Sequence, residues 1–194
     1  MRTYPIAPNG IFKTIQGEGT LLGLPMSFVR LAGCSVGCSQ CDTDYRVDER
    51  LEASQIGNLV RQFRTKWTWI TGGEPADHEL WPLLEEMRLC GYVALATSGT
   101  KSLGSGGRII DFLSVSPHST PDKLVIRSAA QINLVPGLND LRLEDWESYP
   151  FDAFQHRYVT PCDGLGNLNE CLAWIDRHDG FRLGVQVHKI WGLP

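Results

Sequence analysis

The sequence has 194 residues, enough for a substantial core, and we expect residues 1–194 to form a single domain. A hydrophobic content of 42% with 21% charged residues is typical of a soluble globular protein. The formal net charge of −4 argues against a protein built mainly to bind nucleic acid, and no apolar stretch is long enough to cross a bilayer. Because no basic region followed by an apolar signal core opens the sequence, we expect a cytoplasmic protein with reduced cysteines.

The first informative stretch runs over residues 12–20, in which Gly17 and Gly19 flank the carboxylate of Glu18. Glycine lets the backbone turn sharply or approach a ligand closely. A carboxylate held in such a loop can accept two parallel N–H bonds from a guanidine-like edge, as in pterins and guanines. The alternative is an exposed turn with a solvated glutamate.

An alternating apolar pattern predicts a strand over residues 26–32, with Arg30 near its C-terminal end. Arg30 is either a surface arginine or a ligand for a substrate carboxylate, which its planar guanidinium can bind with two hydrogen bonds. Its position beside the cysteines that follow favours the second interpretation.

Three cysteines come directly after this strand with the spacing Cys-x3-Cys-x2-Cys, at Cys34, Cys38 and Cys41. A tight loop can turn three sulfurs toward one point, and thiolates are soft ligands suited to iron–sulfur clusters or zinc. Three sulfurs leave one iron of a four-iron cluster open, and an open iron can chelate S-adenosylmethionine (SAM). Zinc would need a fourth ligand from another cysteine or a histidine. Disulfides are more typical of small secreted chains.

The rest of the chain alternates apolar strands with amphipathic helices, which predicts a parallel α/β sheet with fewer helices than strands. The further strands are predicted over residues 67–71, 92–97, 109–115, 130–135, 152–159 and 182–187. The helices are predicted over 54–63, with Ser54 as N-cap, over 77–90, and around 168–175. Met87, Cys90 and Cys171 are expected in the core. Polar and glycine clusters follow the strands, at the edge where parallel sheets bind ligands.

Four motifs together resemble the 7-carboxy-7-deazaguanine synthases, which are radical SAM enzymes of queuosine and 7-deazapurine biosynthesis. They are Ile15–Gly19, Phe28–Cys34, Cys38–Thr43 and Thr71–Pro75. The resemblance extends to His188 and so covers nearly the whole chain. It implies an α/β fold of the radical SAM type, a shortened partial (β/α) barrel with fewer helices than strands, and a homodimer.

The resemblance also implies roles for individual residues. Cys34, Cys38 and Cys41 would bind a 4Fe-4S cluster, and the hydroxyl of Thr43 would be a ligand of Mg²⁺. The SAM site would be lined by Gln40, Cys41, Asp42, Gly73, Ser98 and Ser116. The substrate would be bound by Ile15, Gln16, Gly17, Glu18, Arg30, Thr71, His188 and the terminal carboxylate of Pro194. No catalytic side chain is implied beyond the cluster and SAM.

The implied reaction is a ring contraction of 6-carboxy-5,6,7,8-tetrahydropterin to 7-carboxy-7-deazaguanine with release of ammonia. A reduced cluster would cleave SAM to a 5′-deoxyadenosyl radical, which would take hydrogen from C6 of the pterin, and SAM would be regenerated. The electron would come from a donor such as flavodoxin.

Three positions depart from the family pattern, and two other functions stay open. Gln40 stands where an aromatic residue is usual, His118 where lysine is common, and Thr160 where glutamine is frequent, so the SAM contacts there are in question. A radical SAM activase that generates a glycyl radical on a partner protein would share the cysteines but would not need Gln16–Gly19. A zinc-stabilised binding module is the non-enzyme alternative.

Overall fold

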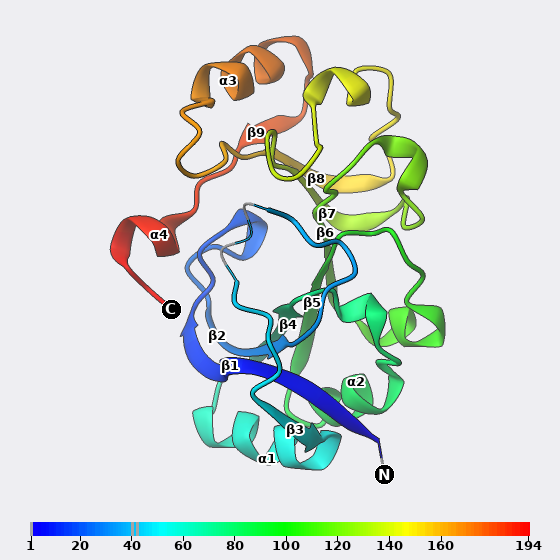
Figure 1. The fold of residues 1–194 in the computed structure, drawn as a ribbon, viewed down its shortest axis with the longest axis vertical. Coiled ribbons are helices and arrows are strands. Elements are labelled where there is room, and N and C mark those ends of the chain that lie inside the picture. The colour runs from blue at the N-terminus through cyan, green and yellow to red at the C-terminus, as the bar shows by residue number, and fades with distance from the viewer. Residues whose placement is uncertain (1, 40, 42) are drawn as a thin grey trace.

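The structure is a computed structural model that describes residues 2–39, 41 and 43–194. Its nine strands form one open sheet in the order β3-β1-β2-β4-β5-β6-β7-β8-β9 (Figure 1). The strands are β1 (Thr3–Ile15), β2 (Pro25–Leu31), β3 (Glu49–Glu52), β4 (Trp67–Gly72), β5 (Tyr92–Thr97), β6 (Phe112–Val115), β7 (Ala129–Leu134), β8 (Phe154–Val159) and β9 (Phe181–Leu183). The α-helices of the described residues are α1 (Ala53–Phe63), α2 (Trp81–Arg88), α3 (Leu168–Arg177) and α4 (Val187–Trp191).

The sheet is parallel from β2 through β4 to β9, whereas β1 runs antiparallel to both β2 and β3. The predicted α/β fold with fewer helices than strands is therefore confirmed. Because parallel strands point the same way, the segments that follow β2, β4, β5, β6, β7 and β8 all leave the sheet at one edge. That edge is where the polar and glycine motifs of the sequence come together.

Alternation along the strands separates the two faces of the sheet. On one face, Val29 and Leu31 of β2 join an aliphatic core with Ile56 of α1. On the other face, Phe28 packs against Trp69 in a smaller cluster that borders a cavity. A shift of one residue in register would exchange the two faces, so this alternation fixes which side chains reach the cavity.

A second, aromatic core lies under β7, β8 and β9. Trp146, Phe151 and Trp174 are buried there, and the rings of Phe151 and Phe181 meet edge to face with centroids 4.9 Å apart. Cys171 of α3 is fully buried in the same core, as predicted. Figure 1 shows α3 beside β9 at this end of the sheet, while α1 and α2 lie at the other end.

Strands β1 and β3 were not expected from the sequence. Pro8, Asn9 and Gly10 interrupt the β1 segment with signals typical of a turn. The structure absorbs them in an irregularity between Ile6 and Ile11, where Asn9 adopts a φ of 50°. The residues before this irregularity pair with β3 and those after it pair with β2, so one long strand serves two neighbours.

Several predicted element boundaries were wrong, including the start of β6, which is Phe112 rather than residue 109. The cap of α1 is Glu52 rather than Ser54, since Glu52 and Gln55 form a capping box. Helix α2 begins at Trp81 rather than residue 77, because Pro75–Asp77 forms a separate 3₁₀ turn, η2, and His78 is extended. The last predicted strand is only three residues long, and the chain beyond it forms the short helix α4.

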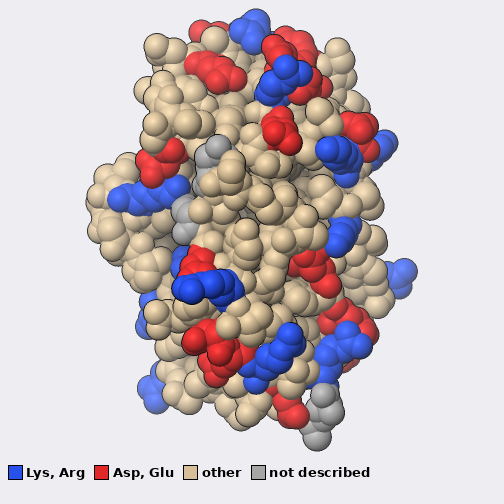
Figure 2. Space-filling view, in the orientation of Figure 1, with Lys and Arg blue, Asp and Glu red and all other residues tan. Residues whose placement is uncertain are grey.

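Charged side chains of both signs are interspersed over the face drawn in Figure 2. Several form ion pairs, including Arg61 with Glu86 at 2.8 Å and Arg142 with Asp145 at 3.0 Å. Pairs this exposed contribute little to stability individually. No helix in the described part of the chain has the length and apolar character needed to cross a membrane.

Candidate active site

A cavity of about 630 Å³ opens at the edge of the sheet where the parallel strands end. Every described residue that the sequence singled out as a ligand lines it. These residues are Ile15, Gln16, Gly17, Glu18, Arg30, Cys34, Cys38, Cys41, Thr43, Thr71, Gly73, Ser98, Ser116, His188 and Pro194. Gln40 and Asp42, the other two predicted SAM ligands, lie outside the described residues. The binding roles of all these residues stay predictions, but their convergence on one cavity is a property of the fold.

The turn that follows β1, residues Gln16–Glu18, forms one wall of the cavity. It is closed by backbone bonds from Gln16 N to Leu24 O (2.9 Å) and from Gly23 N to Gln16 O (2.8 Å). The C-terminal helix packs on it: the amide of Val187 donates to Gly17 O at 2.9 Å. A Cβ on Gly17 would overlap the ring of His188, so glycine is required for this close approach.

Glu18 contributes a carboxylate to the cavity lining, and Gln16 contributes an amide. Gln186 Nε2 donates to Glu18 Oε1 at 2.8 Å, and His188 Nε2 lies 3.8 Å from the same oxygen. Gln16 is 5% exposed, and its Nε2 has no hydrogen-bond partner among the described residues. A buried amide without an acceptor costs about 1–3 kcal/mol. A ligand oxygen bound in the cavity would recover that cost, so the orphaned amide favours a binding role for Gln16.

Arg30 and Thr71 are side by side at the ends of β2 and β4, where the parallel register pairs them directly. The guanidinium carbon of Arg30 lies 4.7 Å from the centre of the Phe12 ring, and Phe12 stacks on Phe28. A cation held over an aromatic face keeps a defined orientation. Phe28 therefore supports Phe12, and Phe12 in turn supports the guanidinium of Arg30 where it lines the cavity.

The described residues of the cysteine loop, which we define as residues 33–39, 41 and 43, line another part of the cavity through Cys34, Cys38, Cys41 and Thr43. Cys34 and Cys38 are half-buried and Cys41 is exposed. Burial, together with the nearby Cys41 and Cys34 thiols, raises the pKa of Cys38 to about 11. Cys38 Sγ lies 3.2 Å from His118 Nδ1, and burial lowers the pKa of that imidazole against the opposing effect of Glu74. His118, the residue at a family departure, thus contacts a predicted cluster ligand.

The three thiols form a donor set that suits an iron–sulfur cluster. Among the described residues, no three His, Cys, Asp or Glu side chains gather closely enough to hold one ion. A zinc site needs its ligands around a single centre. A 4Fe-4S cluster instead bonds each cysteine to a different iron. Three thiols that line one cavity can each bond a different iron of such a cluster and leave its fourth iron open.

The predicted SAM residues follow three consecutive strands. Gly73 comes after β4, Ser98 after β5 and Ser116 after β6. Gly73 packs so closely on the cysteine loop that an added Cβ would overlap the carbonyl of Gly33. Thr160 stands where the family often has glutamine. Its hydroxyl donates to Asn133 Oδ1 at 2.7 Å and so makes a hydrogen bond within the protein.

Further residues line the cavity without having been predicted as ligands, among them Gln131, Asn133, Cys162 and Gln186. Gln131 Oε1 accepts from Thr20 N at 2.8 Å, and its Nε2 donates to Ser114 Oγ at 3.1 Å, so it braces the Gln16–Glu18 wall. The alternation of Gln131 and Asn133 with buried Ile132 and Leu134 is visible in the sequence and could have placed them on the cavity face. Gln186 carries no such signal.

Known proteins resemble this chain both in sequence and in fold. The chain is 32% identical to the 7-carboxy-7-deazaguanine synthase of Haemophilus influenzae over 94% of this chain and 92% of that protein. It is 30% identical to the synthase of Burkholderia multivorans over 99% of this chain and 100% of that protein. The crystal structure of QueE from Escherichia coli matches with a TM-score of 0.74 at 25% identity, covering 96% of this chain and 95% of that one. No protein-family model matches the chain.

The open, largely parallel sheet, with a three-cysteine loop after β2, defines an enzyme of the radical SAM lyase class. Its strands and site motifs extend over nearly the whole length of the relatives. The chain belongs to the 7-carboxy-7-deazaguanine synthase family. This membership favours the synthase over the glycyl-radical activase and the zinc-stabilised module.

Proposed function

We propose that this chain converts 6-carboxy-5,6,7,8-tetrahydropterin to 7-carboxy-7-deazaguanine and ammonia, with SAM used catalytically. One observation carries the proposal beyond family membership: all the described residues that the family resemblance implies line a single cavity, although Ile15 and Pro194 come from opposite ends of the chain. The product would serve queuosine or other 7-deazapurine biosynthesis.

Cys34, Cys38 and Cys41 would hold the 4Fe-4S cluster, and Gly73, Ser98 and Ser116 would bind SAM at the neighbouring strand ends. When bound and reduced, the cluster supplies the electron that cleaves SAM to a 5′-deoxyadenosyl radical. Gly73 offers backbone groups, and the two serines offer hydroxyls, for the polar parts of SAM. Phe28, Trp69 and Val135 form apolar parts of the wall, which exclude water from the reacting groups.

The substrate would be bound from the wall formed by β1, β2 and β4. Arg30 can bind the pterin carboxylate through two parallel N–H bonds, the strong geometry for this pair. Gln16 Nε2 can donate to a ring carbonyl, and the Glu18 carboxylate can accept N–H groups from the guanidine edge. Thr71 and His188 border the same space. Binding from several sides fixes the ring in place for hydrogen abstraction at C6.

Thr43 would be a ligand of Mg²⁺, since hydroxyl oxygen is a hard donor of the kind this ion accepts. It lines the cavity two residues after Cys41. We propose that Mg²⁺ bound there neutralises the substrate carboxylate.

The experiment that tests the reaction is an anaerobic assay. Reconstituted protein is incubated with SAM, dithionite and 6-carboxytetrahydropterin, and the products are measured by liquid chromatography with mass spectrometry. We expect 7-carboxy-7-deazaguanine and ammonia in equal amounts, with SAM recovered. The surface variant Glu79→Gln should behave as the parent, whereas Cys38→Ala should yield no product. A protein that loads iron and cleaves SAM, yet leaves the pterin unchanged, would contradict the substrate assignment.

The remaining proposals concern the setting of the enzyme. We propose that residues 1–194 act as one radical SAM core domain, in the cytoplasm, and receive electrons from a donor such as flavodoxin. We propose a homodimer, which exposed apolar side chains on α3, β9 and α4 support: Leu168, Leu172, Leu183, Ile190 and Trp191. Sedimentation equilibrium at a mass near 21.6 kDa rather than twice that value would contradict the dimer.

A further inference from the structure

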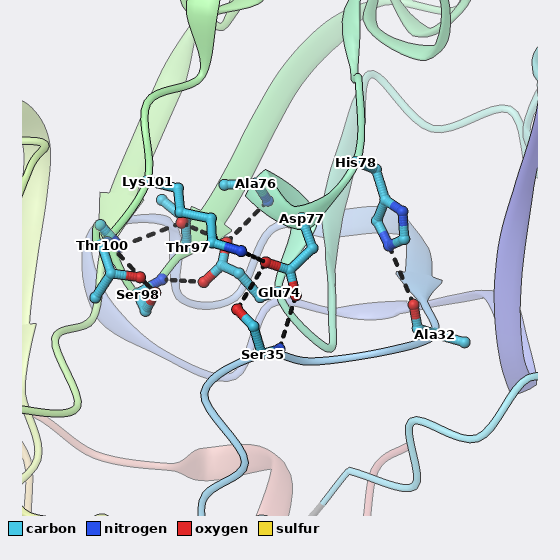
Figure 3. Close-up of polar contacts among 11 residues, drawn as sticks. Ala32, Ser35, Glu74, Ala76, Asp77, His78, Thr97, Ser98, Thr100 and Lys101 are labelled. Carbon is cyan, nitrogen blue, oxygen red and sulfur yellow. Dashed lines mark hydrogen bonds and ion pairs between the residues drawn. The ribbon is translucent and has the colours of Figure 1, made fainter.

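The segment that follows β4, residues Glu74–His78, binds the cysteine loop on both sides of Cys34 (Figure 3). We call it the β4 turn. Glu74 N donates to Gly33 O at 3.0 Å, and His78 Nε2 lies 3.1 Å from the carbonyl of Ala32. Asp77 accepts from Ser35 N and from Ser35 Oγ, both at 2.7 Å. The residues immediately before and after Cys34 are therefore anchored to one short segment.

The same turn binds the segment that follows β5. Glu74 is 2% exposed and accepts from Thr97 Oγ1 at 2.6 Å and from Ser98 N at 2.8 Å. Asp77 accepts from Lys101 Nζ at 2.6 Å. Figure 3 shows Asp77 between Ser35 on one side and Lys101 on the other. The β4 turn thus connects a predicted cluster ligand to a predicted SAM ligand.

Asp77 differs from the other members of this network in what it contributes. Glu74 is buried and holds the sheet edge together, so its removal would disturb the fold. The Asp77 side chain is 17% exposed, and it binds two donors of the cysteine loop and one of the segment that follows β5. Each is a hydrogen bond to an ionised acceptor, the strong kind. Its carboxylate therefore orders the backbone next to Cys34 without forming part of the core.

We propose that Asp77 is a positioning residue for the iron–sulfur site: it fixes the cysteine loop at Ser35 and, through Lys101, its spacing from the segment that carries Ser98. This rests on the proposed function, since it takes Cys34 as a cluster ligand and Ser98 as a SAM ligand. The role belongs to side chains of this chain rather than to the cysteines themselves. It predicts that Asp77 governs how firmly the cluster is held and how SAM approaches it.

The test measures iron release, which needs neither pterin nor turnover. Reconstituted protein is mixed anaerobically with an iron chelator, and the rate of complex formation is followed by absorbance. We expect Asp77→Ala to release iron about tenfold faster than the parent, because the hydrogen bonds of its carboxylate to Ser35 and Lys101 are all lost. Asp77→Asn should fall between, because its amide keeps one acceptor oxygen. The electron paramagnetic resonance change on adding SAM to the reduced cluster should be smaller in both variants.

Asp111 provides a matched control. It also accepts from one cation, Arg88, and from one backbone amide, Val93 N at 2.8 Å, but both partners lie outside the cysteine loop and the segment that carries Ser98. Asp111→Asn should lower thermal stability by an amount similar to Asp77→Asn, while its iron release and its response to SAM match the parent. Release from the Asp77 variants no faster than from Asp111→Asn would overturn the positioning role.

Two further outcomes separate the possibilities. If Asp77→Ala does not fold, Ser35→Ala and Lys101→Met each remove one partner, and each should speed release less than about tenfold. Parent protein that takes up no iron would refute the cluster assignment itself and with it this role. If the parent and all of these variants release iron at the same rate, the positioning role alone is refuted.

Discussion

Two loops that line the same cavity, the Gln16–Glu18 turn and the cysteine loop, are held in place differently. The Gln16–Glu18 turn is largely buried and is held by contacts with Leu24, Gln186 and Val187, so the protein shapes it without a ligand. The cysteine loop has an exposed Cys41, and its sulfurs do not meet at a common centre. Its firmest described anchors lie near its start, at Gly33 and Ser35. The substrate wall is therefore preformed by contacts within the protein, and we expect the cysteine loop to take its final arrangement when the cluster binds.

The largest effect on iron content and turnover is expected when a predicted cluster ligand is removed. Cys34→Ala, Cys38→Ala and Cys41→Ala should each fall far below about four irons per chain after anaerobic reconstitution and lose turnover completely. Cys90→Ala, at a half-buried cysteine outside the cavity lining, is the control and should load iron normally. A Cys38→Ala variant with full iron content would show that the loop is not the cluster site.

Changes in the substrate wall should have the opposite effect, because they weaken pterin turnover and leave the cluster in place. Glu18→Gln and Arg30→Ala should lower kcat/KM for the pterin by about 100-fold, because each loses charge-assisted hydrogen bonds to substrate. Iron content and the SAM response should stay at the parent values. Steady-state kinetics together with iron analysis measure both. Unchanged pterin turnover in either variant would refute the assigned contact.

A smaller effect is expected where the C-terminal helix meets the first turn. Gly17→Ala would place a methyl group against the His188 ring and push α4 away from Glu18. We expect KM for the pterin to rise by about tenfold with kcat nearly unchanged, the pattern of lost uniform binding. Gly107→Ala is the control. Gly107 has no positive φ, and a Cβ there would meet only Leu103 at an ordinary contact distance. An unchanged KM in Gly17→Ala would show that the contact of α4 with this turn does not shape the substrate wall.

The smallest effect concerns pH and the anchor of the cysteine loop. Burial raises the pKa of the Asp77 carboxyl, but hydrogen bonds from Lys101 and Ser35 outweigh it, and the net shift is downward from 3.8. A carboxyl with a lowered pKa in the folded state stabilises the protein above its unfolded pKa, and this contribution is lost as pH falls through the folded value. Denaturant unfolding of the iron-free protein at pH 6 and pH 3 should therefore show a greater loss for the parent than for Asp77→Asn, by no more than about 1 kcal/mol. Equal losses would contradict the direction of the shift.

The sequence predicted the parallel strands and the motif residues that converge on one cavity, because both depend on local signals. Apolar runs mark β2, β4 and β5, and short motifs mark the cysteines, Glu18 and Gly73. Strand β1 escaped because Pro8 and Gly10 are local turn signals that pairing with two neighbours overrides. Gln131 and Gln186 escaped for a related reason: their place at the cavity follows from contacts with Thr20 and Glu18, more than 100 positions away. Such partners are set by tertiary packing rather than by local pattern.

The bond between Glu18 and Gln186 spans 168 positions of the chain. A ribosome adds about 5–20 residues per second, so the segment that completes the substrate wall emerges on the order of ten seconds after the cysteines. During that interval the thiols are already outside while the pocket still lacks one side. We expect the cavity to stay open on this side until the last helix packs on the first turn.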